Sequence, residues 1–239
     1  MFVLRACLFY LLFYPWTLIV IFVALPLSFI SPDLIHKCGI FWGRICLLLA
    51  GLKLEVQGRE NIPHKGPVIY VSNHQSNFDI PIFYAGLAVQ FRWMAKQELF
   101  RVPLFGLAMK RCGYIPIDRS DRRKAMHSLN LAAEKIKAGT SVILFPEGTR
   151  TPDGRVQEFK KGALVIAAKA GVPVVPVAIS GSYQVQPKGH WTVHHSPLKV
   201  QIFPALKTEH LKVSDVEQLT QSIHDQIARA VEGEPLNAR

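Results

Sequence analysis

The chain has 239 residues, of which 49% are hydrophobic, and its formal net charge at pH 7 is +11. This length accommodates one sizeable core and an appendage. The four cysteines form no C-x-x-C pair, which argues against a disulfide framework or a zinc site and fits a reducing compartment. A chain that is both apolar and basic favours a partner that is apolar and anionic, such as a phospholipid membrane, although nucleic acid is also possible for a basic chain.

The first predicted element is an apolar segment, since no charged side chain occurs from Ala6 to Ile30. A helix of about 25 residues is roughly 37 Å long, enough to cross the hydrocarbon core of a bilayer. A second apolar stretch, Cys38 to Leu52, is short for a span and fits a helix in the membrane interface. Residues 1–55 are therefore predicted to be a membrane anchor, either a hairpin that dips into one leaflet or one span with an interfacial helix. A signal peptide fits less well, because the apolar run is long and no cleavage site stands out.

From residue 56 onward, strand-like and helix-like segments alternate, as in an α/β domain. The clearest buried strands are the short apolar runs 68–72 and 141–145. The other expected elements are helices at 79–88, 96–110, 121–137, 159–170 and 214–231, and strands at 113–117, 172–179 and 198–203.

The positive charge is concentrated in mid-chain. Nine Lys or Arg and three Asp or Glu between Arg92 and Lys124 give this stretch a net charge of +6. This pattern predicts one basic face. The stretch lacks the interleaved aromatic side chains that stack on nucleic-acid bases, and the apolar anchor would hold it at a membrane, so nucleic-acid binding is disfavoured.

Polar side chains follow the strand predicted at 68–72. His74 comes directly after it, and Asp79 follows five residues later. A histidine takes up a proton near neutral pH, and a carboxylate bonded to its other ring nitrogen fixes the tautomer and stabilises the imidazolium. The pair can act as a general base, although Asp79 can equally be an ordinary helix cap. Ser76 is the rival covalent nucleophile, but it lacks a G-x-S-x-G elbow.

Two further predicted strands end in charged turns. The strand at 113–117 leads into Asp118-Arg119, and the strand at 141–145 leads into a turn with Glu147, Gly148 and Arg150. Glycine lets a ligand approach the backbone closely, and arginine can bind a phosphate through two hydrogen bonds. Each turn can also be an exposed ion pair. If the three strand ends meet at one edge of a sheet, the site suits a phosphorylated substrate with a hydroxyl to activate.

Four sequence blocks together resemble the glycerolipid acyltransferase family. They are N-H-Q-S-N-F-D at 73–79, G-Y-I-P-I-D-R at 113–119, F-P-E-G-T-R at 145–150 and V-P-V-V-P-V-A-I at 172–179. Each is weak alone, but their order and spacing, over roughly residues 56–205, are specific. The resemblance implies an α/β fold: a single acyltransferase-type domain with a mixed central sheet at 56–239, preceded by the helical membrane anchor at 1–55.

The resemblance also implies a reaction, in which a fatty acyl group passes from acyl-CoA or acyl-carrier protein to the 2-hydroxyl of lysophosphatidate and gives phosphatidate. By position, His74 is the general base and Asp79 orients it. The resemblance assigns binding of the glycerol phosphate to Arg119, Glu147, Gly148, Thr149 and Arg150. Lys96 matches a basic position that contacts phosphate or the oxyanion. Asn77 and Thr151 replace an expected aromatic residue and serine, and neither departure is expected to touch a chemical group.

No cofactor or metal is expected, since the chain has no Walker loop or G-x-G-x-x-G motif, and His190, His194 and His195 have no carboxylate or cysteine close in sequence. The expected location is a membrane, on the cytoplasmic face of the bacterial inner membrane. Two alternatives remain. The same chemistry can serve another lysophospholipid or a lyso-aminolipid, or the protein can be a non-catalytic, basic lipid-binding membrane protein, which the intact His74–Asp79 pair disfavours.

Overall fold

The computed structural model describes residues 2–118, 120–160 and 163–233. Within these residues, seven strands form one sheet in the order β1-β7-β6-β2-β5-β3-β4. Only β6 and β7 pair antiparallel, so the sheet is mixed, as predicted. The strands are β1 (Leu54–Gln57), β2 (Ile69–Ser72), β3 (Arg92–Lys96), β4 (Ile115–Ile117), β5 (Val142–Leu144), β6 (Val174–Ser180) and β7 (Leu198–Ile202).

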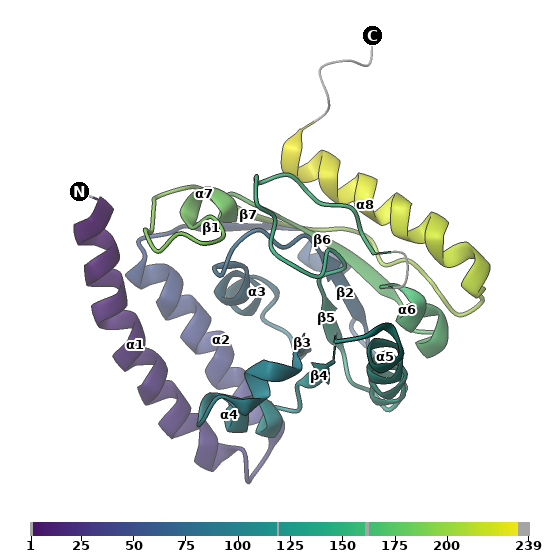
Figure 1. Ribbon diagram of the computed structural model, residues 1–239, viewed down its shortest axis with the longest axis horizontal. Coiled ribbons are helices and arrows are strands. Elements are labelled where there is room, and N and C mark those ends of the chain that lie inside the picture. Colours follow the sequence, from purple (N-terminus) through teal and green to yellow (C-terminus); the bar gives the residue numbers. More distant parts are fainter. Residues whose placement is uncertain (1, 119, 161–162, 234–239) are drawn as a thin grey trace.

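Helices cover both faces of the sheet (Figure 1). The helices are α1 (Phe2–Leu27), α2 (Pro32–Leu49), α3 (Asp79–Leu87), α4 (Phe105–Arg111), α5 (Arg122–Lys137), α6 (Val165–Ala170), α7 (Ser182–Val185) and α8 (Val216–Glu232), with 3₁₀ turns η1 (Arg59–Asn61), η2 (Gln97–Arg101) and η3 (Val213–Asp215). The central strand β2 is buried throughout, as expected for a parallel strand covered on both faces. Its Tyr70 joins the core cluster under α2 and α3, whereas Ile69 and Val71 join the cluster under α5, α6 and α8.

Two expected elements differ from the structure. Residues 96–110 were expected to be helical because Lys, Gln, Glu and Leu are good helix formers. Lys96 instead ends β3, a strand that the sequence pattern did not reveal, because Trp93 pairs with Ile143 and Met94 with Ile115 in the sheet. The helix expected at 159–170 begins only at Val165, and the backbone N–H of Lys160 instead donates to the carbonyl oxygen of Pro146 at 3.1 Å. Tertiary pairing overrides local propensity in both places.

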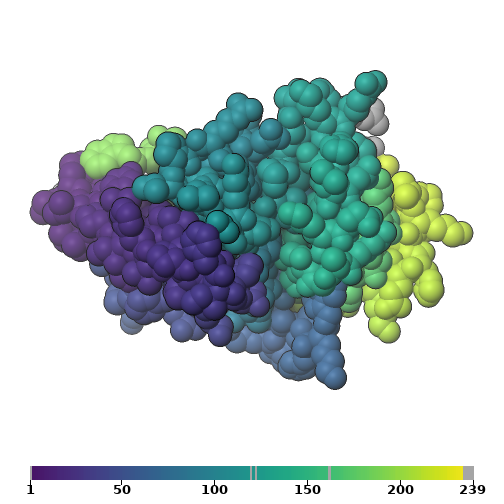
Figure 2. Space-filling view, turned by 90° about the horizontal axis from the view of Figure 1, so that it is seen from below, coloured from purple at the N-terminus to yellow at the C-terminus, as the bar shows by residue number. Residues whose placement is uncertain are grey.

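The helix α1 is, among the described residues, the one long and apolar enough to cross a membrane, a test that signal sequences and core helices also pass. Its mean hydropathy is 2.3 over the most apolar 18-residue window, and only 11% of that window is buried. Nevertheless α1 lies along the body of the protein (Figure 2), with Phe9 buried near one end and Ala24 near the other. An apolar outer side is therefore exposed along most of its length.

The helix α2 packs between α1 and α3 and so connects α1 to the α/β domain. The indole N–H of Trp42 donates to the Oγ1 of Thr17 in α1 at 3.0 Å. On its other side, α2 packs closely against α3, because Gly43 lies where a Cβ would come within 2.8 Å of the carbonyl oxygen of Pro81. The buried ring of His36 donates from Nε2 to the carbonyl oxygen of Val89 at 2.9 Å. The second predicted apolar stretch is thus a helix packed on the α/β domain.

Candidate active site

The pair His74 and Asp79 lies at the carboxyl end of β2, where α3 begins. The Nδ1 of His74 donates to the Oδ2 of Asp79 at 2.7 Å, and the carboxylate is fully buried. The same oxygen accepts the backbone N–H groups of Gln75 at 2.7 Å and Ser76 at 2.9 Å. Three converging donors fix the carboxylate, which in turn keeps the proton on Nδ1. The lone pair of Nε2 is therefore available to accept a proton.

The ring of His74 stacks on Phe145, with ring centroids 4.1 Å apart and an interplanar angle of 10°. Phe145 follows β5, which pairs parallel with β2, so the sheet register itself brings the two rings together. The His74 side chain is 19% exposed and lines a cavity. Stacking and the Asp79 bond together leave the imidazole little freedom to turn away from that cavity.

The backbone around His74 is held by residues far away in sequence. The side chain of Asn73 donates to the carbonyl oxygen of Ile179 in β6 at 2.8 Å and accepts the N–H of the same residue at 2.9 Å. The backbone N–H of Thr151 donates to the carbonyl oxygen of His74 at 2.9 Å. The sequence indicated no role for Asn73, because its partner lies in a strand more than a hundred residues later.

Glu147 braces His74 from the neighbouring strand end. Its Oε1 accepts the backbone N–H of His74 at 2.7 Å, and its Oε2 accepts the N–H of Gln157 at 3.3 Å. The side chain is 4% exposed, and this burial raises the pKa of Glu147 to about 7, although the two backbone hydrogen bonds oppose the shift. Both oxygens face the backbone and Glu147 does not line the cavity. This geometry gives it a positioning role toward His74.

The turn after Glu147 carries the cationic part of the site. Gly148 has a φ of +74°, and a Cβ there would lie 2.7 Å from the Nζ of Lys160. The Nζ of Lys188 donates to the Oγ1 of Thr149 at 3.1 Å. Three cations, Arg150, Lys160 and Lys188, therefore gather at this turn. Lys188 lies in a loop between β6 and β7, and no motif in the sequence pointed to it.

Asn77 holds the arginine of this turn. Its Oδ1 accepts a hydrogen bond from the Nη1 of Arg150 at 2.7 Å, and its amide nitrogen lies 3.3 Å from the Oε1 of Gln186. The expectation that the unusual residue at position 77 touches no chemical group is therefore wrong. The reason is that residues 73–79 and 145–150 follow adjacent parallel strands, so their loops meet.

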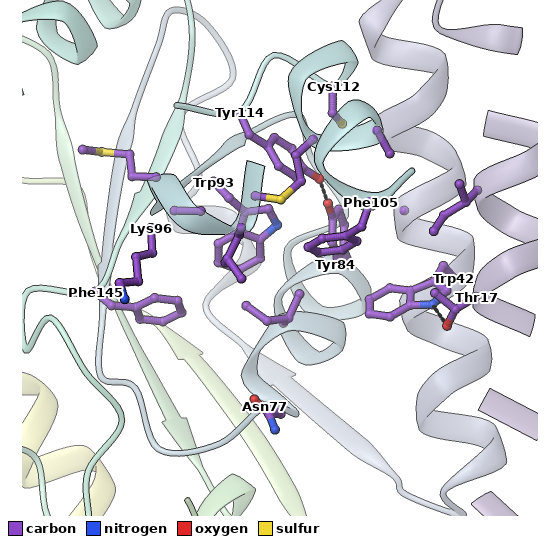
Figure 3. Close-up of a pocket in the computed structure, with 18 of the residues that line it drawn as sticks. Thr17, Trp42, Asn77, Tyr84, Trp93, Lys96, Phe105, Cys112, Tyr114 and Phe145 are labelled. Atoms are coloured by element: carbon purple, nitrogen blue, oxygen red, sulfur yellow. Dashed lines mark hydrogen bonds between the residues drawn. The ribbon is translucent and has the colours of Figure 1, made fainter. Parts of the chain in front are cut away.

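Two predicted cations remain. Lys96 ends β3 and is exposed, with its Nζ 3.4 Å from the Oε1 of Glu98. It lines the same cavity as His74 and Phe145 (Figure 3). Arg119 lies outside the described residues. The structure thus brings together Lys96, His74 and the turn 148–150, which lie at or just after the carboxyl ends of three adjacent parallel strands, β3, β2 and β5.

The cavity beside His74 has a volume of about 530 Å³, in the range of sites for small ligands. One part is polar, with Lys96, His74 and the turn 148–150. The rest is apolar and extends between β3, α3, α4 and the helices α1 and α2 (Figure 3), where the hydroxyl groups of Tyr84 and Tyr114 are hydrogen-bonded to each other. Its apolar lining includes Val20, Ile21, Ile35, Trp42, Ile80, Trp93, Met94, Phe105 and Met109.

Candidate nucleophiles on the chain are poorly placed for attack. Ser76 is fully buried, and its hydroxyl donates to the carbonyl oxygen of Gln186 at 2.9 Å. Cys112 lines the cavity, but burial raises the pKa of its thiol to about 12, so it stays protonated. Across the part of the chain that the structure describes, no group of three or more His, Cys, Asp or Glu side chains is arranged to hold a metal ion.

An imidazole that faces a cavity with a polar and an apolar part, with its tautomer set by a buried carboxylate, is suited to remove a proton from a lipid hydroxyl. Enzymes that transfer acyl groups to hydroxyl groups use this chemistry. The chain belongs to the Acyltransferase family, whose family model matches residues 53–180.

The names of individual relatives also describe acyltransferases. The chain is 34% identical over 213 residues to a 1-acyl-sn-glycerol-3-phosphate acyltransferase of Pseudomonas aeruginosa, a match that covers 86% of this chain and 82% of that protein. It is 42% identical over 152 residues to a chloroplast enzyme of the same name from Brassica napus, covering 63% of this chain and 44% of that protein. The chain thus matches less than half the length of this plant relative.

A solved structure has the same fold over the whole chain. The crystal structure of the 1-acyl-sn-glycerophosphate (LPA) acyltransferase PlsC from Thermotoga maritima superposes with a TM-score of 0.85 at 33% sequence identity. The match covers 100% of this chain and 99% of that one. The predicted single acyltransferase fold, with an apolar helix at its N-terminus, is therefore confirmed.

The buried carboxyl of Glu147 predicts a pH-dependent stability. Its folded-state pKa of about 7 lies above its usual value, so the folded protein holds a proton that the unfolded chain releases, and stability falls as pH rises from about 4.5 to 7. Glu147→Gln removes this pH-dependent contribution to the free energy of unfolding. Relative to the variant, the wild type should lose about 2–3 kcal/mol over that range, measured by denaturant unfolding in detergent. A difference between the wild type and Glu147→Gln that stays constant across this pH range would contradict the assignment.

Proposed function

We propose that the protein transfers a fatty acyl group from acyl-CoA or acyl-carrier protein to the 2-hydroxyl of 1-acyl-glycerol 3-phosphate, also called lysophosphatidate, and so makes phosphatidate. The observation that carries the proposal is the His74–Asp79 pair beside a cavity that is cationic in one part and apolar in the other. Lysophosphatidate has the matching chemistry, with a phosphate, a free hydroxyl and an acyl chain. The names of the bacterial relatives support this acceptor.

The reaction needs one base and no protein nucleophile. The Nε2 of His74 takes the proton of the 2-hydroxyl as the hydroxyl oxygen attacks the thioester carbonyl carbon. The tetrahedral oxyanion that forms then expels the thiolate by breaking the carbon–sulfur bond. The imidazolium, stabilised by Asp79, returns the proton to the thiolate, so the products are the new ester and a free thiol. The hydroxyl of Ser76 is buried and hydrogen-bonded, and the thiol of Cys112 is neutral. Both observations support direct attack without an acyl-enzyme.

The cationic turn is the proposed phosphate site. Arg150 can form two parallel hydrogen bonds with a phosphate, and Asn77 orients its guanidinium from one side. Lys160 and Lys188, which flank Gly148 and Thr149, add charge to the same turn. Lys96 lines the same cavity, and we assign it to contact with the phosphate or with the oxyanion. The apolar part of the cavity is then the place for an acyl chain.

The membrane is the proposed source of the acceptor. The outer side of α1 exposes a row of large apolar side chains, including Leu4, Leu11, Phe22 and Val23. Because α1 is packed on the body at both ends, an orientation across the bilayer would draw the α/β domain into the hydrocarbon. We infer that α1 instead lies in one leaflet. Free cysteines and a soluble thioester donor favour the cytoplasmic face of a bacterial inner membrane.

Two alternatives differ in the acceptor or in the chemistry. Another lysophospholipid or a lyso-aminolipid can use the same base, and a non-catalytic protein can bind lipid through the same surfaces. Purified protein in detergent, supplied with acyl-CoA and a panel of lysolipids, separates them by the release of free thiol. Fastest release with lysophosphatidate supports the proposal, and no release with any lysolipid, from acyl-CoA or from acyl-carrier protein, favours a binding protein.

His74→Ala removes the base. Loss of a general base typically costs about 10²–10⁴-fold in rate, and we expect kcat to fall in that range. The control His127→Ala changes an exposed histidine on α5 and should retain full activity. Thiol release under saturating lysophosphatidate measures both. Activity of His74→Ala near the wild-type rate would exclude His74 as the base.

Arg150→Ala removes the proposed phosphate ligand. Hydrogen bonds to charged groups contribute about 1.5–3 kcal/mol, so we expect KM for lysophosphatidate to rise by about 10–100-fold and KM for acyl-CoA by far less. Asn77→Ala should give a smaller rise in the same KM, because it only orients Arg150. Arg155→Ala, an exposed arginine a few residues later, is the control. An equal rise in both KM values for Arg150→Ala would count against the phosphate role.

A further inference from the structure

A second apolar surface lies outside the N-terminal helices. After residue 51, the described part of the chain exposes eight large apolar side chains, and five of them fall between residues 99 and 107. These five are Leu99, Val102, Leu104, Phe105 and Leu107, all in or between η2 and α4. Scattered apolar residues on a surface need no explanation, but such a concentration in one short segment marks an interaction site.

The turn inside this segment is built at a conformational cost. Leu104 has a φ of +57° and a ψ of −53°, a positive-φ conformation that is unusual for a side chain with a Cβ. Gly106 follows, where a Cβ would lie 2.3 Å from the carbonyl oxygen of Phe100, so the chain turns back tightly on η2. Glycine at position 104 would reduce the strain. The leucine there is 44% exposed, so packing within the protein alone does not account for it.

This surface is continuous with the exposed side of α1. The helix α4 packs against α1, and the guanidinium of Arg111 lies 4.1 Å from the ring centroid of Phe29, which follows α1. Figure 2 shows the purple atoms of α1 beside the blue-teal atoms of the segment on one face of the molecule. Two stretches that are far apart in sequence therefore form one apolar face.

The charges around the segment match an anionic bilayer. Arg101, Lys110 and Arg111 are exposed in it, and its one acidic side chain, Glu98, already pairs with Lys96. Apolar side chains that enter the acyl region, flanked by cations at headgroup level, are typical of segments that bind to a membrane surface. A soluble protein partner would not explain why the apolar face continues along α1.

The same segment forms a wall of the cavity. Leu99 and Phe105 line it from η2 and α4 and are also partly exposed on the outer surface. A lipid chain that moves between the bilayer and His74 therefore passes the segment that contains Leu99 and Phe105. We propose that residues 97–111 are a second membrane-binding surface, continuous with α1, through which the acceptor lipid enters the cavity from an anionic bilayer. The entry of the acceptor rests on the proposed function, whereas the membrane contact does not.

The membrane contact is tested by depth-dependent quenching, without any activity measurement. An environment-sensitive fluorophore is placed at Leu107→Cys or, as a matched control, at Leu131→Cys on α5, which is 55% exposed. The background carries Cys7→Ser and Cys38→Ser, since Cys46 and Cys112 are buried. Vesicles contain phosphatidylethanolamine and phosphatidylglycerol with brominated acyl chains. We expect strong quenching at position 107 and little at 131. A label at 107 quenched no more than one at 131, while a label on Cys7 in a separate protein that keeps Cys7 and carries only Cys38→Ser is quenched, would overturn the proposal.

The entry step is tested with charge substitutions. Val102→Glu/Leu107→Glu should reduce acyl transfer to lysophosphatidate in vesicles by at least about tenfold, but transfer to a short-chain, monomeric lysophosphatidate by less than about twofold. The control Leu131→Glu/Val213→Glu should change neither rate. An equal loss on both acceptors, or no loss on either, excludes an entry role. If the protein transfers acyl groups to no lysolipid, the proposed function fails, and the quenching experiment alone still decides the membrane contact.

Discussion

The site depends on one buried oxygen, the Oδ2 of Asp79, on which an imidazole N–H and two backbone N–H groups converge. These bonds stabilise a charge that is fully removed from water, and they fix which nitrogen of His74 carries a proton. A second buried carboxyl, that of Glu147, holds the backbone of the same histidine. One acidic side chain therefore orients the ring and the other its main chain. In the proposed reaction, an imidazole held in this way needs little rearrangement to take up the proton of a hydroxyl.

The parts of this site that are local in sequence could be predicted from it. His74 and Asp79 are five residues apart, between a buried strand and a helix start, so a strand-to-helix junction suffices to bring them together. The sharing of one sheet edge by the segments after β2 and β5 followed from treating both as parallel strands. The apolar N-terminal segment was equally evident, because the length and hydrophobicity of a helix are properties of composition.

The parts that depend on register between distant strands could not be predicted. The bond from Glu147 to the backbone of His74 and the bond from Asn77 to Arg150 each join residues 73 positions apart. They exist because β2 and β5 pair directly, which no periodicity in the sequence specifies. The strand β3 was missed because it is short and its last residue, Lys96, begins a run of good helix formers. Its structure is determined by its pairing partners in the sheet. The cavity, whose lining residues extend from Thr17 to Arg150, has no sequence signal at all.

In the proposed mechanism, the hydroxyl of the substrate, activated by His74, is the nucleophile, and the protein supplies none. Rapid mixing of the enzyme with acyl-CoA in the absence of any acceptor tests this claim most directly, with free thiol followed on the millisecond scale and the mass of the intact protein measured afterwards. Direct attack predicts no burst of thiol and no added acyl mass until lysophosphatidate is supplied. A burst equal to the enzyme concentration, together with one acyl group on the protein, would contradict it.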